Sequence, residues 1–216
     1  MTPTSLPNVT STPAPVPSGA GATHRPPLDE VGATLLHAAG RLLAAEGPSA
    51  LTVRRIANDA GMSTMNVYSR FGGKQGVVEQ LFLEGFAQLS QYMGAAPITD
   101  DPVADLRACG RAYRQFALDH PTMYGVMFEH VVPDYEPSAL ALTSGLATLQ
   151  QLADRIERCM RTGRFRVGEP LHVAAVVWSA CHGAVSLEMK QKLSLAIDWE
   201  AVYRDTCEAT VRGLAP

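Results

Sequence analysis

The sequence lacks the features that would assign it to several familiar classes of protein. It has no run of about 18 or more apolar residues and no basic start followed by an apolar stretch. We therefore expect neither a membrane-spanning helix nor a secretory signal, and we place the chain in the cytoplasm. It also has no nucleophile elbow, Gly-rich phosphate loop or HExxH motif, which makes an all-α enzyme an unfavoured alternative.

Cysteine is scarce and widely spaced. Cys109, Cys159, Cys181 and Cys207 form no CxxC pair and no Cys/His ligand spacing. We expect no metal site and no cofactor, and we interpret the cysteines as reduced residues buried in helices. A redox-sensing role is the alternative left open.

Large apolar side chains are nearly absent from residues 1–27, which consist mostly of Pro, Thr, Ser, Ala and Gly. Such a segment cannot bury enough surface to offset the entropy lost on ordering, so we predict a disordered tail.

No alternating strand pattern is found either, whereas apolar residues recur at helical spacing from about residue 28 onward. Gly and Pro mark the breaks between these segments. The sequence predicts an all-α fold with about nine helices, near residues 31–46, 53–60, 64–71, 74–93, 102–120, 122–128, 138–162, 170–190 and 198–212.

Positive charge is concentrated in one place. Between Thr52 and Val78 there are four basic residues and one acidic residue, although the whole chain has a net charge of -3. The same segment holds two short amphipathic helices separated by Gly61, with Thr52 and Ser63 as expected N-caps. This arrangement is typical of a helix-turn-helix, whose second helix enters the major groove of DNA.

The outward face of that second helix is polar. Thr64, Asn66, Ser69 and Arg70 point away from the expected core residues Val67 and Phe71. Asn suits adenine and Arg suits guanine in the major groove, and the local positive charge suits phosphates. An ordinary helical hairpin with a solvated face is the alternative on pattern alone.

The motif resembles the DNA-binding domain of TetR-family transcriptional regulators. The resemblance is carried by Leu51–Ala57, Ala60–Ser63, Val67–Phe71 and Lys74, without a gap. It implies that Thr52, Tyr68 and Lys74 hold phosphates and that Arg54 contacts backbone or bases. It further implies that Thr64, Met65, Asn66, Ser69 and Arg70 lie at or near base edges, and we add Ser63 to this DNA-binding set.

The second half is similar to a TetR subgroup named for a Trp-His-Gly set, here Trp178, His182 and Gly183. In the family, this half binds a small molecule and forms the dimer. Aromatic and Met side chains suit a ligand pocket as well as a helical core. The candidate pocket residues are Phe116, His120, Met123, Tyr124, Met127, Phe128, Trp178 and His182.

Together these features predict a tail (residues 1–27), a helix-turn-helix head (28–74) and a ligand-binding and dimerisation domain (75–216), linked by a helix near residues 74–93. We expect a repressor that binds a palindromic operator as a homodimer through its last two helices. A small, largely apolar effector would release it. The alternative from a different class is a sequence-indifferent architectural DNA-binding protein, which a basic chain would suit better.

Overall fold

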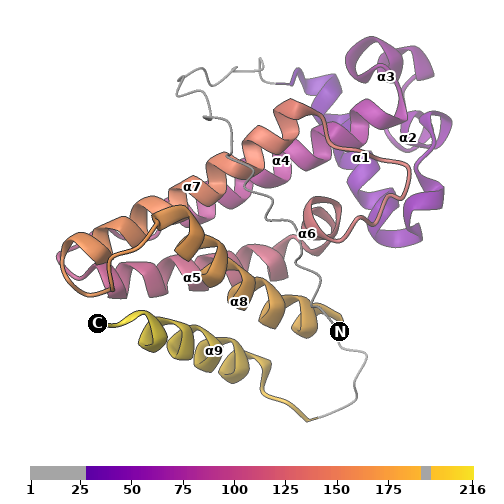
Figure 1. The fold of residues 1–216 in the computed structure, drawn as a ribbon. Coiled ribbons are helices and arrows are strands. Elements are labelled where there is room, and N and C mark those ends of the chain that lie inside the picture. Colours follow the sequence, from indigo (N-terminus) through magenta and orange to yellow (C-terminus); the bar gives the residue numbers. More distant parts are fainter. Residues whose placement is uncertain (1–27, 191–195) are drawn as a thin grey trace, which may run out of the picture.

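The computed structural model describes residues 28–190 and 196–216, and these form nine α-helices, one 3₁₀ helix and no β-strand (Figure 1). The all-α prediction is confirmed, whereas the predicted tail lies outside the described residues. The α-helices are α1 (Glu30–Glu46), α2 (Val53–Asp59), α3 (Thr64–Phe71), α4 (Lys74–Gly94), α5 (Pro102–Asp119), α6 (Pro121–Phe128), α7 (Ala139–Arg161), α8 (Pro170–Lys190) and α9 (Trp199–Leu214); η1 (Pro48–Ala50) is the 3₁₀ helix.

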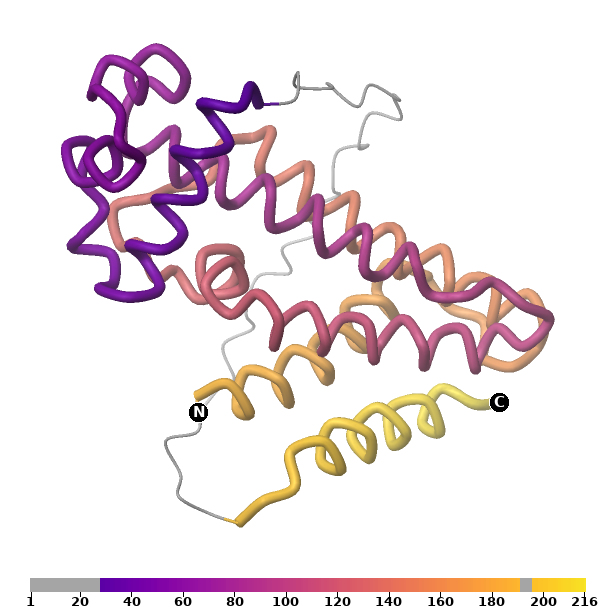
Figure 2. Tube along the Cα trace, turned by 180° about the vertical axis from the view of Figure 1, so that it is seen from behind, coloured from indigo at the N-terminus to yellow at the C-terminus, as the bar shows by residue number. Residues whose placement is uncertain are grey.

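Helices α1, α2 and α3 pack together as a small head at one end of the molecule (Figures 1 and 2). Leu35, Ile56 and Val67, one from each helix, are fully buried. Asp29 caps α1 by accepting a hydrogen bond from the Gly32 N–H at 2.7 Å, which satisfies a backbone donor at the helix start. Gly47 ends the same helix with a φ of 79°, a left-handed conformation that favours glycine.

Helix α4 joins the head to the rest of the chain. It contacts α1 and α3 of the head, and it also contacts α5, α6 and α7. Gly76, near its start, approaches the head so closely that a Cβ atom there would lie 1.7 Å from the Phe71 carbonyl oxygen. The predicted boundary at residue 74 therefore falls at the start of a helix shared by both parts.

Helices α5 to α9 build the remaining body. Helix α4 lies beside α7, and α8 lies between α7 and α9 (Figures 1 and 2). One hydrophobic cluster runs through head and body, from Leu35 to Tyr203. An ion pair between a half-buried Arg158 and the buried Asp105 links α7 to α5, with Arg158 Nη1 3.0 Å from Asp105 Oδ2. The Thr99 backbone N–H donates to the same carboxylate and is the main reason that the pKa of Asp105 is lowered.

Helix α8 is the most apolar long helix of the described residues. By length and composition alone it could cross a membrane, a test that core helices of soluble proteins also pass. It packs against α5, α7 and α9, but Val176 and Leu187 stay 45% and 56% exposed. These two apolar side chains therefore stay on the surface of the protomer.

Candidate functional site

The turn between α2 and α3 has the geometry of a helix-turn-helix. Thr52 caps α2, as predicted, by accepting a hydrogen bond from the Arg55 N–H at 3.3 Å. Gly61 has a φ of 67°, and the Met62 N–H donates to the Ala57 carbonyl at 2.8 Å. Ser63 occupies the expected N-cap position of α3, but its side chain accepts no backbone N–H. The Asn66 amide donates to Ser63 Oγ instead, at 3.2 Å.

Helix α3 presents an open face to solvent. Val67 and Phe71 are buried against the head, as predicted. Met65 and Tyr68 are 71% and 56% exposed, which is unusual for large side chains of this kind. Thr64 and Ser69 of α3 are also exposed. Thr52 and Arg54, at the start of α2, are exposed as well.

Ion pairs reduce the free positive charge of the head. Arg55 makes a two-pronged contact with Glu46, with an Nη2–Oε1 distance of 2.6 Å. Arg54 and Lys74 have no ion pair within residues 28–190 and 196–216. These two side chains are therefore cations of the motif that no acidic side chain of the described residues neutralises.

Arg70 lies in a network that the sequence did not predict. Its Nη2 is 2.7 Å from Asp29 Oδ2 and its Nε is 2.9 Å from Oδ1, so it joins α3 to the cap of α1. Its Nη1 also donates to Asn66 Oδ1 at 2.9 Å. The hydrogen bonds from Arg70 are the main reason that the pKa of Asp29 falls to about 2. In this position Arg70 orients the Asn66 amide, which was predicted to face base edges.

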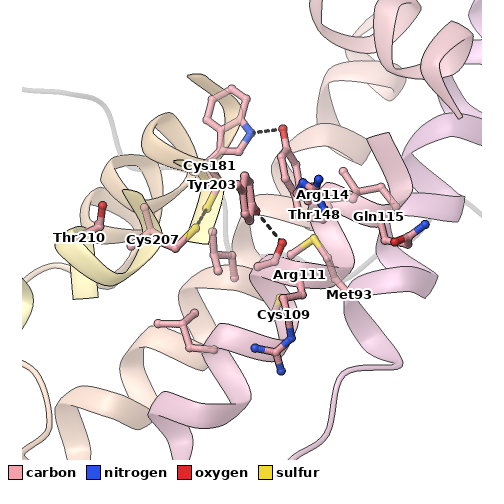
Figure 3. A pocket seen from close by; sticks show the side chains of 18 of the residues that line it. Met93, Cys109, Arg111, Arg114, Gln115, Thr148, Cys181, Tyr203, Cys207 and Thr210 are labelled. Carbon is pink, nitrogen blue, oxygen red and sulfur yellow. Dashed lines mark hydrogen bonds between the residues drawn. The ribbon is translucent and has the colours of Figure 1, made fainter. Parts of the chain in front are cut away.

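A cavity of about 770 Å³ opens in the body among α4 to α9 (Figure 3). Its walls are mainly apolar, as ligand sites usually are. The apolar wall includes Phe82, Phe86, Leu89, Leu149, Leu152 and Val177, and the polar groups include Arg107, Arg111, Arg114 and Thr148.

The predicted pocket residues separate into two groups. Met127, Phe128 and Trp178 line the cavity. The other five are not part of its lining: Phe116, His120, Met123, Tyr124 and His182.

Four of those five residues belong to two aromatic groups, one of Phe116 and His120 with Tyr92 and one of Tyr124 and His182 with Phe128 and Trp178. His182 stacks on Tyr124 with an interplanar angle of 20°, and its Nδ1 lies 2.6 Å from the Tyr124 hydroxyl. Tyr124 and Phe116 are fully buried, and His120 lies 3.2 Å from the Tyr92 hydroxyl through Nε2. Burial lowers the pKa of His182, so its neutral form prevails at pH 7. Trp178 belongs to this second group and also lines the cavity, where its indole N–H donates to the Tyr113 hydroxyl at 3.2 Å.

Sequence reasoning missed the polar residues of the cavity. Arg107, Arg111 and Arg114 recur at helical spacing on α5, a signal that was present in the sequence. Arg107 and Arg114 pair with Glu208 and Glu188, at 2.6 Å in each case. Arg111 is exposed and has no ion pair among the described residues.

Two family comparisons match separate parts of the chain. Residues 35–81 match the family of bacterial regulatory proteins described as the tetR family. Residues 106–210 match the tetracyclin repressor-like C-terminal domain. These regions contain the helix-turn-helix and most of the cavity lining, respectively.

Individual relatives agree with these matches. HTH-type transcriptional regulators of Mycobacterium bovis and Mycobacterium tuberculosis are 26% identical over 146 residues, which is 64% of this chain and 61% of theirs. The chain thus covers less than two thirds of these curated relatives.

Solved structures share the fold. A protein of unknown function from Rhodococcus sp. RHA1 has a TM-score of 0.76 and 22% identity, covering 90% of this chain and 98% of that one. SmeT in complex with triclosan has a TM-score of 0.62 and 18% identity, covering 87% and 93%.

Proposed function

Because the chain belongs to the TetR family of bacterial regulatory proteins, we propose that it is a ligand-responsive repressor that binds a palindromic operator in the cytoplasm. Two copies bind one operator, with one recognition helix α3 in each of two successive major grooves. A small, largely apolar effector bound in the cavity lowers the affinity for the operator. The Trp-His-Gly subgroup stays a prediction, since the matched C-terminal family is described only as tetracyclin repressor-like.

The exposed face of α3 is the observation that carries this proposal. Met65 and Tyr68 stand out from a helix whose opposite side, Val67 and Phe71, is anchored in the core. An exposed apolar and aromatic surface beside polar side chains is suited to base edges, thymine methyl groups and phosphates. Thr52, Arg54 and Lys74 complete the surface with phosphate-binding groups.

Selection of genomic DNA fragments bound by the full chain tests the proposal. We expect a small set of fragments that share an inverted repeat, with half-sites separated by about 10 base pairs or a multiple of a helical turn. An architectural DNA-binding protein would instead recover fragments without a shared sequence. Genes beside the selected fragments would indicate the class of effector.

A second copy is proposed to dock on α8 and α9. Val176 and Leu187 of α8 and Val202 of α9 are exposed apolar residues. Burial of such side chains between two-fold related copies would form a four-helix interface. The same arrangement would set the distance between the two α3 helices.

The effector is proposed to act through α4. This helix extends from Lys74 at the head to Met93 at the cavity wall, so a tilt at one end displaces the other. SmeT, which shares the fold, forms a complex with triclosan, a small molecule. An effector that prefers one position of α4 would change operator affinity only by its differential binding to the two states.

Reciprocal titrations test this coupling. Compounds found by thermal-shift screening should weaken operator binding by about 5- to 150-fold, and operator DNA should weaken compound binding by the same factor. Isothermal titration with and without operator measures both. A compound that binds tightly in the cavity yet leaves operator affinity unchanged would contradict the coupling while leaving DNA binding intact.

Substitution of Lys74 should weaken binding to every DNA sequence. Lys74→Ala removes one phosphate-binding cation, so the slope of log affinity against log salt should fall by about one. Asn66→Ala should instead reduce discrimination at one base pair by about 1–3 kcal/mol. Fluorescence anisotropy over a series of salt concentrations separates the two effects. If Asn66→Ala weakened binding to operator and random DNA equally, as Lys74→Ala is expected to do, the role assigned to Asn66 would be contradicted.

Removal of the Asp29 charge should free Arg70. Asp29→Asn keeps an N-cap side chain for α1 but no longer holds the guanidinium, so Arg70 becomes available to phosphates. We expect stronger binding to random DNA, a salt slope steeper by about one, and weaker discrimination because Asn66 loses its orientation. Glu30→Gln is the matched control, because it removes a neighbouring charge without touching Arg70. If the two variants changed DNA affinity, salt slope and discrimination equally, only the loss of one negative charge would matter, and the contact between Asp29 and Arg70 would have no role of its own.

A further inference from the structure

Two thiols face each other across the contact between α8 and α9. Cys181 Sγ lies 3.5 Å from Cys207 Sγ, although the residues are 26 positions apart in the chain (Figure 3). Both cysteines are free. Their sulfur atoms are close enough that a shift of about 1.5 Å would bring them to the length of a disulfide bond.

The cavity gives small molecules access to this pair. Both cysteines line it, and Cys207 is only half-buried. Cys109 lines the same cavity, but its thiol makes no hydrogen bond to another thiol among the described residues. Cys159 is fully buried, lies outside the lining and donates its S–H to the Pro102 carbonyl. The four cysteines thus differ in both access and partners.

We propose that Cys181 and Cys207 form a dithiol oxidation site, which a hydroperoxide converts to an intrachain disulfide in the cavity wall. This inference is independent of the operator and of the effector. It rests on the contact between the sulfur atoms and on their shared exposure to the cavity.

The reaction needs hydrogen peroxide or an alkyl hydroperoxide as the oxidant. The Cys181 thiolate attacks one peroxide oxygen and the O–O bond breaks; the leaving oxygen takes the Cys207 proton, and Cys181 becomes a sulfenic acid. The Cys207 sulfur then attacks Cys181 Sγ, the S–O bond breaks, and the departing hydroxide is protonated to water. Two thiols lose two electrons in total, and the peroxide gains them.

The hydrogen bond between the thiols supports these roles. Donation by the Cys207 thiol lowers the pKa of Cys181, and the same hydrogen bond raises the pKa of Cys207. Cys181 is therefore the better nucleophile toward peroxide, and Cys207 resolves the sulfenic acid.

The disulfide would tie α9 to α8 at the cavity. Tyr203, one helical turn before Cys207, donates its hydroxyl to the Gly110 carbonyl of α5 at 2.6 Å (Figure 3). The cross-link would therefore fix three helices around one part of the cavity. Because it closes a loop in the unfolded chain, the oxidised protein should also melt at a higher temperature.

Peptide mapping of the oxidised full chain tests the proposal. The reduced protein is treated with hydrogen peroxide, denatured in N-ethylmaleimide and digested without reductant. Before alkylation we expect a protomer mass lower by about 2 Da. After alkylation and digestion we expect one peptide pair joined through Cys181 and Cys207, alkylated Cys109 and Cys159, and no such pair in a sample first treated with dithiothreitol. Linkage of other cysteines, or alkylation of all four after peroxide treatment, would overturn the proposal.

Single substitutions separate the pair from its neighbour. Cys181→Ser and Cys207→Ser should each abolish the loss of about 2 Da that marks the disulfide, and Cys207→Ser should leave Cys181 as a sulfenic acid that a sulfenic-acid probe labels, because no thiol resolves it. Cys109→Ser is the matched control in the same cavity and should form the disulfide as the unchanged chain does. Loss of the disulfide in the Cys109 variant would overturn the assignment, and the peptide map of the unchanged chain gives a result that does not depend on folding of the variants.

Discussion

Alanine in place of Gly76 should abolish operator binding and strongly destabilise the head. A Cβ atom at this position would lie 1.7 Å from the Phe71 carbonyl oxygen, a backbone atom that cannot rotate away. Helix α3 must then separate from the start of α4, which disturbs the buried residues Phe71, Val77 and Val78. We expect a loss of about 2–4 kcal/mol in the free energy of unfolding, measured by urea denaturation, and a displaced recognition helix.

Gly40→Ala is the matched control for this substitution. Gly40 lies within α1 of the same head, where a new Cβ would meet only Leu81 Cδ2, at 4.0 Å. Alanine inside a helix is favoured over glycine by about 1 kcal/mol, so this variant should be slightly more stable and bind operator normally. A Gly76→Ala protein that unfolds and binds DNA like the unchanged chain would refute the close approach of α3 and α4.

Truncation of Arg155 should cause the largest loss of stability in the body. Its Nη2 donates to the carbonyls of Met93 and Ala96, each at 2.9 Å, and its Nη1 donates to Pro97 at 3.0 Å. These carbonyls lie at and just beyond the end of α4, where a positive charge is favourable; the Met93 carbonyl also accepts the Ala96 N–H at 3.3 Å. The side chain is only 6% exposed, so Arg155→Ala leaves acceptors unpaired, and we expect a loss of about 3–5 kcal/mol.

Arg161→Ala provides the comparison for Arg155→Ala. Arg161 lies on the same helix α7 and is exposed, so its substitution should change the free energy of unfolding by less than about 0.5 kcal/mol. Guanidinium denaturation of both variants measures the two changes in the free energy of unfolding. Equal, small effects would mean that the carbonyl contacts of Arg155 do not stabilise the end of α4.

Local signals explain why the helices were predicted well. Thr52 and Gly61 delimit α2 through a cap and a left-handed residue, which depend only on neighbouring residues. Pro102 begins α5 for the same kind of reason. The helix-turn-helix is contiguous in sequence, so the exposure of Thr64 and Ser69 could be predicted, whereas Asn66 and Arg70 are half-buried through the contact with Asp29.

Contacts between distant residues explain what could not be predicted. Asp29 and Arg70 are 41 positions apart, and nothing in the local pattern pairs them. Cys181 and Cys207 looked widely spaced in the sequence but meet because α8 and α9 pack side by side. His182 shares an apolar stripe with Trp178, yet only Trp178 reaches the cavity, since helical periodicity does not say which neighbouring helix each side chain meets.

The most direct test of the central claim is a competition titration with one selected genomic fragment and a scrambled fragment of equal length. At physiological salt, the full chain should prefer the selected fragment by about 10³-fold or more, and Asn66→Ala should erode that preference without abolishing binding to the scrambled fragment. Equal affinity for the two fragments, unchanged by the substitution, would contradict recognition of an operator by α3.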